Sequence, residues 1–148
     1  MSQLLVFFLG EERYGLEVDK IQEVVEAEEL FYVPRAPQHV MGALNFHSQV
    51  VPVFDLGGFL QLGDQQRDHR VVVLAGSEMK LALAVTQVVG FRAMSEEALL
   101  PESEERRANT YIRAVQNEQD EMINLLDLER LTAAIDETFV DRGGERGA

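Results

Sequence analysis

Three residues in one short stretch of the chain have the side-chain types of a hydrolase triad. His47 and Ser48 are adjacent, and Asp55 follows seven positions later in "NFHSQVVPVFDL". A nucleophilic serine needs a base within hydrogen-bond reach, and it commonly lies on a sharp turn of the pattern G-x-S-x-G. Ser48 has neither glycine, and neighbouring side chains of an extended chain point to opposite faces. We therefore interpret His47 and Ser48 as a hairpin turn and expect no catalytic residue here.

Other kinds of chemical site also lack support in the sequence. His39, His47 and His69 do not have the i, i+4 spacing of a zinc-binding helix, and no run of carboxylates has the order of a calcium-binding loop. The absence of cysteine excludes thiolate chemistry and sulfur-ligated zinc. The two Gly-Gly pairs fit neither a P-loop nor a dinucleotide fingerprint. We expect no metal site, no cofactor and no enzyme activity.

The charge of the chain bears on its partners. The sequence has 26 acidic and 13 basic residues, a net charge of −13 over 148 residues. Such a field repels phosphate backbones and anionic membrane surfaces, so we expect neither nucleic acid nor direct membrane insertion. The apolar run Leu4 to Leu9 is too short for a signal sequence or a membrane span. These features predict a cytoplasmic protein.

The order of apolar runs predicts a mainly β fold. Short runs rich in Val, Ile and Phe are bounded by Gly, Pro, Asn and acidic residues, which is typical of many strands and few helices. Leu4 to Leu9 with Tyr14 to Val18 forms one predicted hairpin, and Met41 to Phe46 with Val50 to Asp55 forms another. Ile21 to Val25 could be a strand or one face of a helix.

The C-terminal third adds a hairpin and a helix. The hairpin turns at residues 117–120, and Asp127 begins an amphipathic helix. The apolar side of this helix consists of Leu128, Leu131, Ile135 and Phe139. Asp55 is also a candidate cap for a short helix. We predict one domain over residues 1–140, followed by a flexible tail at 141–148.

Three segments occur in the order found in a known family. They are "LVFFLGEERYGLEVDKIQEVVE", "VPRAPQHVMGALNFHSQVVPVFDL" and "YIRAVQNEQDEMINLLDLERL". Together they resemble the CheW-like coupling proteins of bacterial chemosensory systems over about residues 3–133. The resemblance implies two intertwined, SH3-like, five-stranded β-barrels with a shared apolar core, short helices and a C-terminal helix.

The resemblance also implies an adaptor that catalyses no reaction. Proteins of this family join the cytoplasmic tip of a methyl-accepting chemoreceptor to the regulatory domain of a CheA-type histidine kinase, within membrane-associated receptor arrays. The implied receptor-facing positions are Ile21, Glu23, Gly42, Asn45 and His47. The implied kinase-facing positions, on strands of the second barrel, are Ala82, Val85, Val88 and Phe91. A core position is the more common role for residues such as Ile21, Val85 and Val88, because β-branched side chains in strands are commonly buried.

One departure from the family leaves two functions open. The family commonly has N-L-R-G where this chain has Asn45, Phe46, His47 and Ser48. Replacing arginine by histidine removes a planar, permanently charged group. The chain is therefore either a chemosensory adaptor or a divergent CheW-like module with a degraded receptor site that serves another kinase or regulator.

Overall fold

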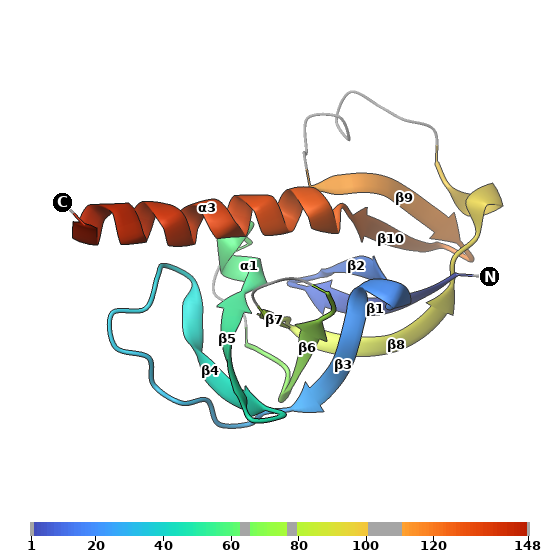
Figure 1. Cartoon of the computed structure of the whole chain (residues 1–148). Coiled ribbons are helices and arrows are strands. Elements are labelled where there is room, and N and C mark those ends of the chain that lie inside the picture. Colours follow the sequence, from blue (N-terminus) through green and yellow to red (C-terminus); the bar gives the residue numbers. More distant parts are fainter. Residues whose placement is uncertain (1, 63–65, 77–79, 101–110, 148) are drawn as a thin grey trace.

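Two β-sheets and one long helix make up most of the described part of the protein. In a computed structural model of the chain, residues 2–62, 66–76, 80–100 and 111–147 are described, with side chains as far as residue 139. The two sheets lie side by side, and the C-terminal helix runs from the first sheet along the second (Figure 1).

Each sheet has five strands. The first has the order β8 (Gln87–Ala93), β1 (Gln3–Leu9), β2 (Glu12–Glu17), β10 (Glu121–Leu126) and β9 (Ile112–Glu118). The second has the order β3 (Ile21–Glu26), β6 (Arg70–Leu74), β7 (Ala82–Ala84), β5 (Gln49–Asp55) and β4 (Val40–Phe46). Neighbouring strands are antiparallel except for the parallel pairs β2–β10 and β5–β7.

The sheets are intertwined along the chain. The first sheet is built from β1 and β2 and then from β8 to β10, while the second sheet takes all the strands between them. The parallel pairing of Tyr14 in β2 with Asn124 in β10 joins the two parts of the first sheet. The prediction of a mainly β fold with two intertwined five-stranded units is confirmed, and Ile21–Glu26 is a strand rather than a helix.

A shared core lies between the sheets, and each sheet has a smaller core of its own. Phe7 from β1, Phe54 from β5 and Ile135 from the C-terminal helix are completely buried in the shared core. Alternate residues of β1, such as Leu4, pack instead into a core within the first sheet. Both faces of β1 are therefore buried, and each large apolar side chain contributes about 1.5–3 kcal/mol.

Two hairpins turn on pairs of residues with positive φ. His47 and Ser48 have φ values of 50° and 66°, and they connect the paired residues Phe46 and Gln49. Positive φ at both central residues is the geometry of a type I′ turn, which matches the twist of the flanking strands. The prediction that His47 and Ser48 mark a turn is confirmed. Gln119 and Asp120 have the same geometry between β9 and β10.

The helices begin at aspartates, as the sequence predicts. Asp55 caps α1 (Leu56–Phe59), where its Oδ1 accepts a hydrogen bond of 3.1 Å from the N–H of Gly58. Asp127 Oδ1 accepts from the N–H of Arg130 at the start of α3 (Leu128–Gly147). The helix continues through residues 141–147, so the predicted tail boundary falls within it. Two short 3-10 segments also occur among the described residues, η1 (Val18–Lys20) and η2 (Glu96–Ala98).

A buried carboxylate, that of Asp68, links the two sheets through hydrogen bonds. Asp68, just before β6, accepts hydrogen bonds at Oδ1 from the N–H of Arg70 (2.9 Å) and at Oδ2 from the N–H of Val88 in β8 (2.7 Å). The Arg70 side chain lies 3.2 Å from the same carboxylate. Burial alone would raise the pKa of Asp68, but the hydrogen bonds from Val88 and Arg70 and the arginine charge hold that pKa below its usual range.

Candidate functional site

Two of the predicted receptor-facing residues, Glu23 and His47, lie where the two edges of the second sheet approach each other. Glu23 is on β3 and His47 is in the β4–β5 turn, at opposite edges of the strand order. In a flat five-stranded sheet these edges would lie about 19 Å apart. His47 Nε2 nevertheless lies 3.9 Å from Glu23 Oε1, with the two side chains 69% and 53% exposed. The sheet therefore curls until its edges approach, and both polar groups remain accessible to a partner.

Asn45 extends this surface. It is exposed on β4 and pairs with Val50 of β5, so the two side chains share one face. Ile21 is half-buried against the shared core, so only part of its side chain can meet a partner. We call Glu23, Asn45 and His47 the edge site.

Gly42, the fifth receptor-facing position implied by the resemblance, is buried beneath the preceding segment. A Cβ at this position would lie 2.7 Å from the carbonyl oxygen of Phe31 and 2.9 Å from Cβ of Leu30. Residue 42 must therefore be small because another part of the backbone crosses it. The physical role of Gly42 in this structure is close packing beneath the surface.

The four predicted kinase-facing residues do not form one exposed surface. Ala82 is completely buried inside the second sheet, and the side chains of Val85 and Val88 are buried in the shared core. Only Phe91 is exposed, at 58%. The four also do not lie in one unit, because Val88 and Phe91 belong to β8 of the first sheet. The interpretation of Val85 and Val88 as core residues is the correct one.

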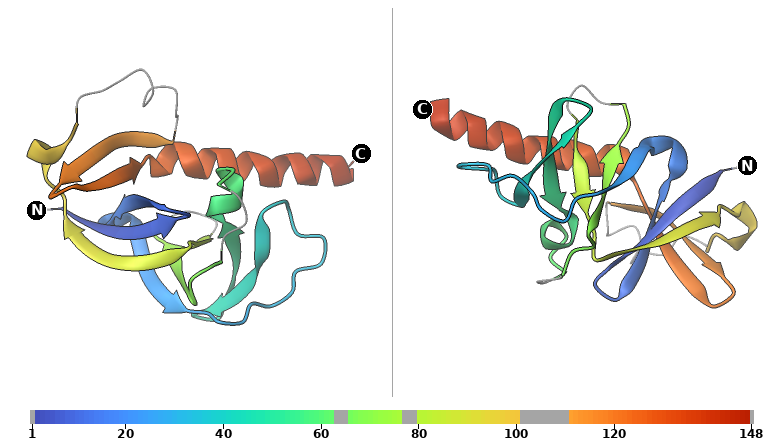
Figure 2. Two further views of the ribbon diagram at one scale, coloured as in Figure 1. Left: turned by 180° about the vertical axis from the view of Figure 1, so that it is seen from behind. Right: turned by 90° about the horizontal axis from the view of Figure 1, so that it is seen from below.

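Four exposed apolar side chains, not found by the sequence analysis, lie on the second sheet and on the segment before β4. They are Phe31 (66% exposed), Tyr32 (85%), Met41 (45%) and Val50 (76%). The Phe31 N–H donates to the carbonyl of Ala43 at 2.8 Å, so the segment before β4 lies along the outer edge of that strand (Figure 2). We call these four residues the apolar surface. The sequence feature that could have indicated these exposed residues is the Phe31–Tyr32 pair shortly before Pro34, because it belongs to no run with helical or strand periodicity.

His47 and Ser48 lie too far from Asp55 in the structure to act together as a catalytic triad. His47 and Ser48 form the turn before β5, whereas Asp55 ends that seven-residue strand. At about 3.3 Å per residue the two ends lie about 20 Å apart. The Asp55 carboxylate instead accepts a hydrogen bond in the cap of α1. Among the described residues, no group of three His, Asp or Glu side chains could hold a metal ion.

Exposed polar and apolar side chains on adjoining strands are typical of a protein-binding module. The chain belongs to the CheW family, since the family model for the CheW-like domain matches residues 3–136. The chain is 25% identical over 144 residues to the chemotaxis protein CheW of Klebsiella aerogenes, covering 95% of this chain and 87% of the relative. It is 30% identical over 136 residues to protein FrzA of Myxococcus xanthus, covering 88% and 84%.

The fold also matches a solved structure. The scaffolding protein TtCheW from Thermoanaerobacter tengcongensis superposes with a TM-score of 0.73 at 23% identity, over 85% of this chain and 88% of that one. The match shows a shared fold of two intertwined sheets. No helix within the described residues is long and apolar enough to cross a membrane.

Proposed function

We propose that this protein is a chemosensory adaptor that joins the cytoplasmic tip of a chemoreceptor to the regulatory domain of a CheA-type histidine kinase, and that it catalyses no reaction. The observation that carries the proposal is the CheW-like match over residues 3–136. The adjoining edge site and apolar surface support it, because an adaptor needs accessible surface for two partners. The proposal places the protein in the cytoplasm, at receptor arrays.

The edge site is the proposed receptor contact. Its groups are a carboxylate, an amide and an imidazole, all exposed and all on the curled edge of the second sheet. Polar groups of this kind fix the orientation of a partner and contribute specificity more than affinity. The edge also leaves Ile21 partly accessible as an apolar contact.

The apolar surface is the proposed kinase contact. Val50 and Phe31 are large apolar side chains that are mostly exposed, and binding energy commonly concentrates in a few such anchors. A single β-bridge between Phe31 and Ala43 holds this anchor beside β4. Phe91 on β8 is a further exposed candidate, because it is the accessible member of the implied kinase set.

The alternative proposal is a divergent CheW-like module that serves another kinase or regulator. It is favoured by the sequence of the turn at the edge site, where His47 and Ser48 replace the arginine and glycine common in the family. A degraded receptor site would leave kinase binding intact while receptor binding is lost.

Titration calorimetry with the two partners tests both proposals. The cognate CheA regulatory domain and a receptor hairpin fragment are titrated separately into the full chain. Val50→Glu should weaken kinase binding about thirtyfold, because losing a good anchor costs on the order of 2 kcal/mol. Met122→Glu is the matched control, since Met122 is about half exposed on the first sheet.

The receptor titration uses variants of the edge site. Glu23→Lys should weaken binding of the receptor fragment, whereas His47→Arg should preserve or strengthen it, because guanidinium adds donors and full charge. Kinase binding without receptor binding would favour the divergent module. Failure of the wild-type chain to bind either partner would contradict the adaptor proposal.

A further inference from the structure

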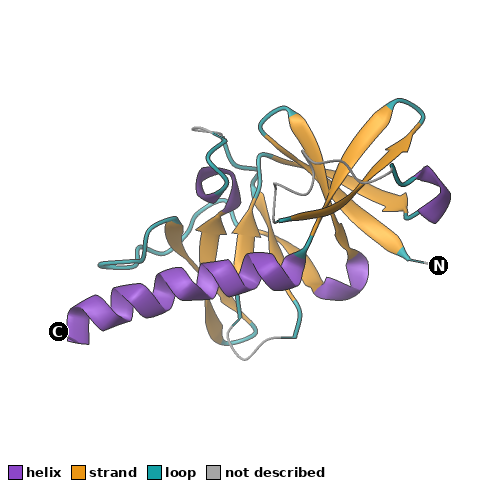
Figure 3. Ribbon diagram, turned by 90° about the horizontal axis from the view of Figure 1, so that it is seen from above, coloured by secondary structure: helices purple, strands orange, loops and turns teal. Residues whose placement is uncertain are grey.

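α3 begins where the chain leaves the first sheet and runs along the second (Figure 3). Two adjoining hollows lie beside the start of this helix. Their volumes are about 240 Å³ and about 260 Å³. Lys20 of η1 and Leu128 and Glu129 of α3 line both hollows, so the two hollows lie side by side. We call this pair of hollows the junction groove. It lies on different residues from the edge site and the apolar surface.

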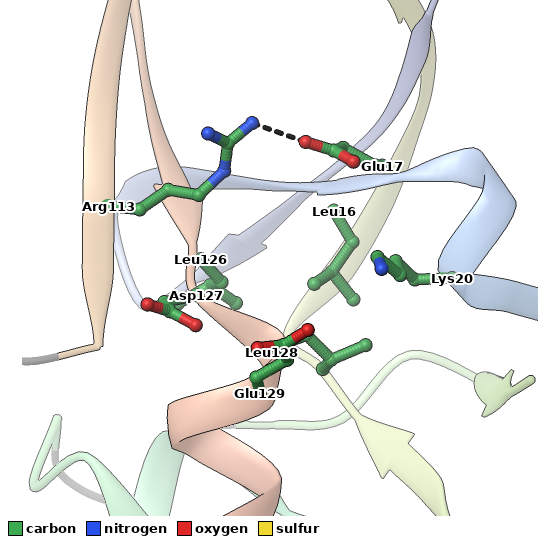
Figure 4. Close-up of a pocket in the computed structure, with 8 residues that line it drawn as sticks. All are labelled: Leu16, Glu17, Lys20, Arg113, Leu126, Asp127, Leu128 and Glu129. Atoms are coloured by element: carbon green, nitrogen blue, oxygen red, sulfur yellow. Dashed lines mark hydrogen bonds and ion pairs between the residues drawn. The ribbon is translucent and has the colours of Figure 1, made fainter. Parts of the chain in front are cut away.

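The floor of the junction groove is apolar. Figure 4 shows Leu16 from β2, Leu126 from β10 and Leu128 from α3 gathered in the first hollow. The second hollow adds Leu74 from β6 and Leu81. These leucines come from both sheets and from the helix, so the hollows lie where the three elements meet.

The rim of the junction groove carries unpaired carboxylates. Two ion pairs already neutralise part of the rim, Glu17 with Arg113 and Asp127 with Arg130. Glu129 and Asp136 are exposed and form no ion pair with the described residues. Lys20 is the remaining charge, so these three groups sum to −1, and the net charge of −13 on the whole chain has the same sign. The groove is therefore complementary to a cationic occupant.

The sizes of the hollows indicate what kind of occupant fits. Each is smaller than the roughly 300 Å³ at which small-molecule sites begin, so each suits a single apolar side chain. We propose that the junction groove binds a basic amphipathic segment of a partner protein, which inserts one apolar side chain into each hollow and places lysine or arginine beside Glu129 and Asp136. The inference is independent of the adaptor function proposed above.

The test uses a synthetic helical peptide as the probe, with leucines one turn apart and lysines elsewhere. The reference peptide has glutamate in place of every lysine. Amide shifts of the full-length, isotope-labelled protein are recorded by NMR during each titration. The lysine peptide should shift the amides of Lys20, Leu128 and Thr132, and the glutamate peptide should not bind.

Charge variants separate the groove from general attraction to an acidic protein. Glu129→Lys combined with Asp136→Lys should weaken binding of the lysine peptide about tenfold. Glu11→Lys combined with Glu118→Lys changes the net charge equally at exposed ends of the first sheet, and it should change the affinity by less than about twofold. If the first pair fails to fold, Glu129→Gln with Asp136→Asn replaces it, with an expected loss of about threefold.

Four results of the peptide titrations would overturn the proposal. They are absence of binding, shifts that map outside the groove, equal binding of both peptides, and equal effects of the two charge variants. Concentration-dependent shifts at Leu128 and Thr132 without peptide would assign the groove to a second copy of the chain and would also overturn it.

Discussion

Removing the carboxylate of Asp68 should destabilise the whole fold, although this residue lies in a polar stretch of sequence. Its side chain is 5% exposed and accepts from the N–H groups of both Arg70 and Val88. Asp68→Ala leaves the N–H of Val88 buried without a partner, which costs about 1–3 kcal/mol. It also removes charge-assisted hydrogen bonds from Arg70, so we expect a total loss of about 3 kcal/mol in the free energy of unfolding.

Urea denaturation followed by circular dichroism measures this loss. The midpoint should fall while the slope stays constant, because the surface exposed on unfolding is the same. Asp68→Asn should cost less than Asp68→Ala, since the amide oxygen can still accept from Val88. Asp19→Ala is a matched control at an exposed position of η1 and should change stability by less than about 0.5 kcal/mol.

The pH dependence gives an independent check on the same residue. The pKa of Asp68 is lowered in the folded protein, so folding favours its ionised form. The stability that it contributes is fully present above the unfolded pKa of about 3.9, and it is lost as the pH falls through the lower folded pKa. Asp68→Asn should lack this acid-dependent part. A loss below about 0.5 kcal/mol in Asp68→Ala, or identical acid profiles for wild type and Asp68→Asn, would refute the reasoning.

Three further measurements follow from individual residues. Ser48→Gly should raise the free energy of unfolding by about 1 kcal/mol, because glycine adopts the positive φ of this turn without strain; a lower urea midpoint would contradict the turn geometry. Gly42→Ala should lower the free energy of unfolding by about 1–3 kcal/mol, because the added Cβ clashes with the Phe31 carbonyl oxygen. Unchanged stability would contradict the close packing of this segment on residue 42. Burial, and then the charge and hydrogen bond of Glu12, raise the pKa of Tyr14 to about 12. The neutral phenol should therefore contribute stability that is lost as the pH rises from about 10 through 12. Ultraviolet titration of the wild type against Tyr14→Phe measures the ionisation of Tyr14, and ionisation near pH 10 would contradict the prediction.

Local structure could be predicted from the sequence, because the interactions that determine it are short in range. The turn at His47 and Ser48 follows from the two apolar runs that flank it, and the structure has the expected hairpin. The caps formed by Asp55 and Asp127 satisfy N–H groups only three residues away. The spacing of Leu131 and Ile135 likewise determines which side of the final helix faces the core.

The assignment of strands to sheets was decided by the tertiary structure. The segment around Val88 is an apolar run in the sequence, and nothing local shows that it pairs with Phe7 in β1, about eighty residues earlier. That pairing buries Val88 and removes it from the predicted kinase surface, while Phe91 on the same strand stays exposed. The pairing of β8 with β1 shifts register between Val88 and Gly90, and such a bulge changes which side chains of the strand are buried in a way that the local sequence does not indicate.

The candidate site depends on the tertiary structure for the same reason. Family resemblance picked out Glu23 and His47, but only the curling of the second sheet brings their side chains within 3.9 Å. Phe31 lies beside β4 only because its segment crosses Gly42 and forms a bridge to Ala43. The sequence by itself determined the turns, caps, helix and family of this protein. The surfaces available to partners were decided by long-range strand pairing and packing, since burial depends on residues distant along the chain.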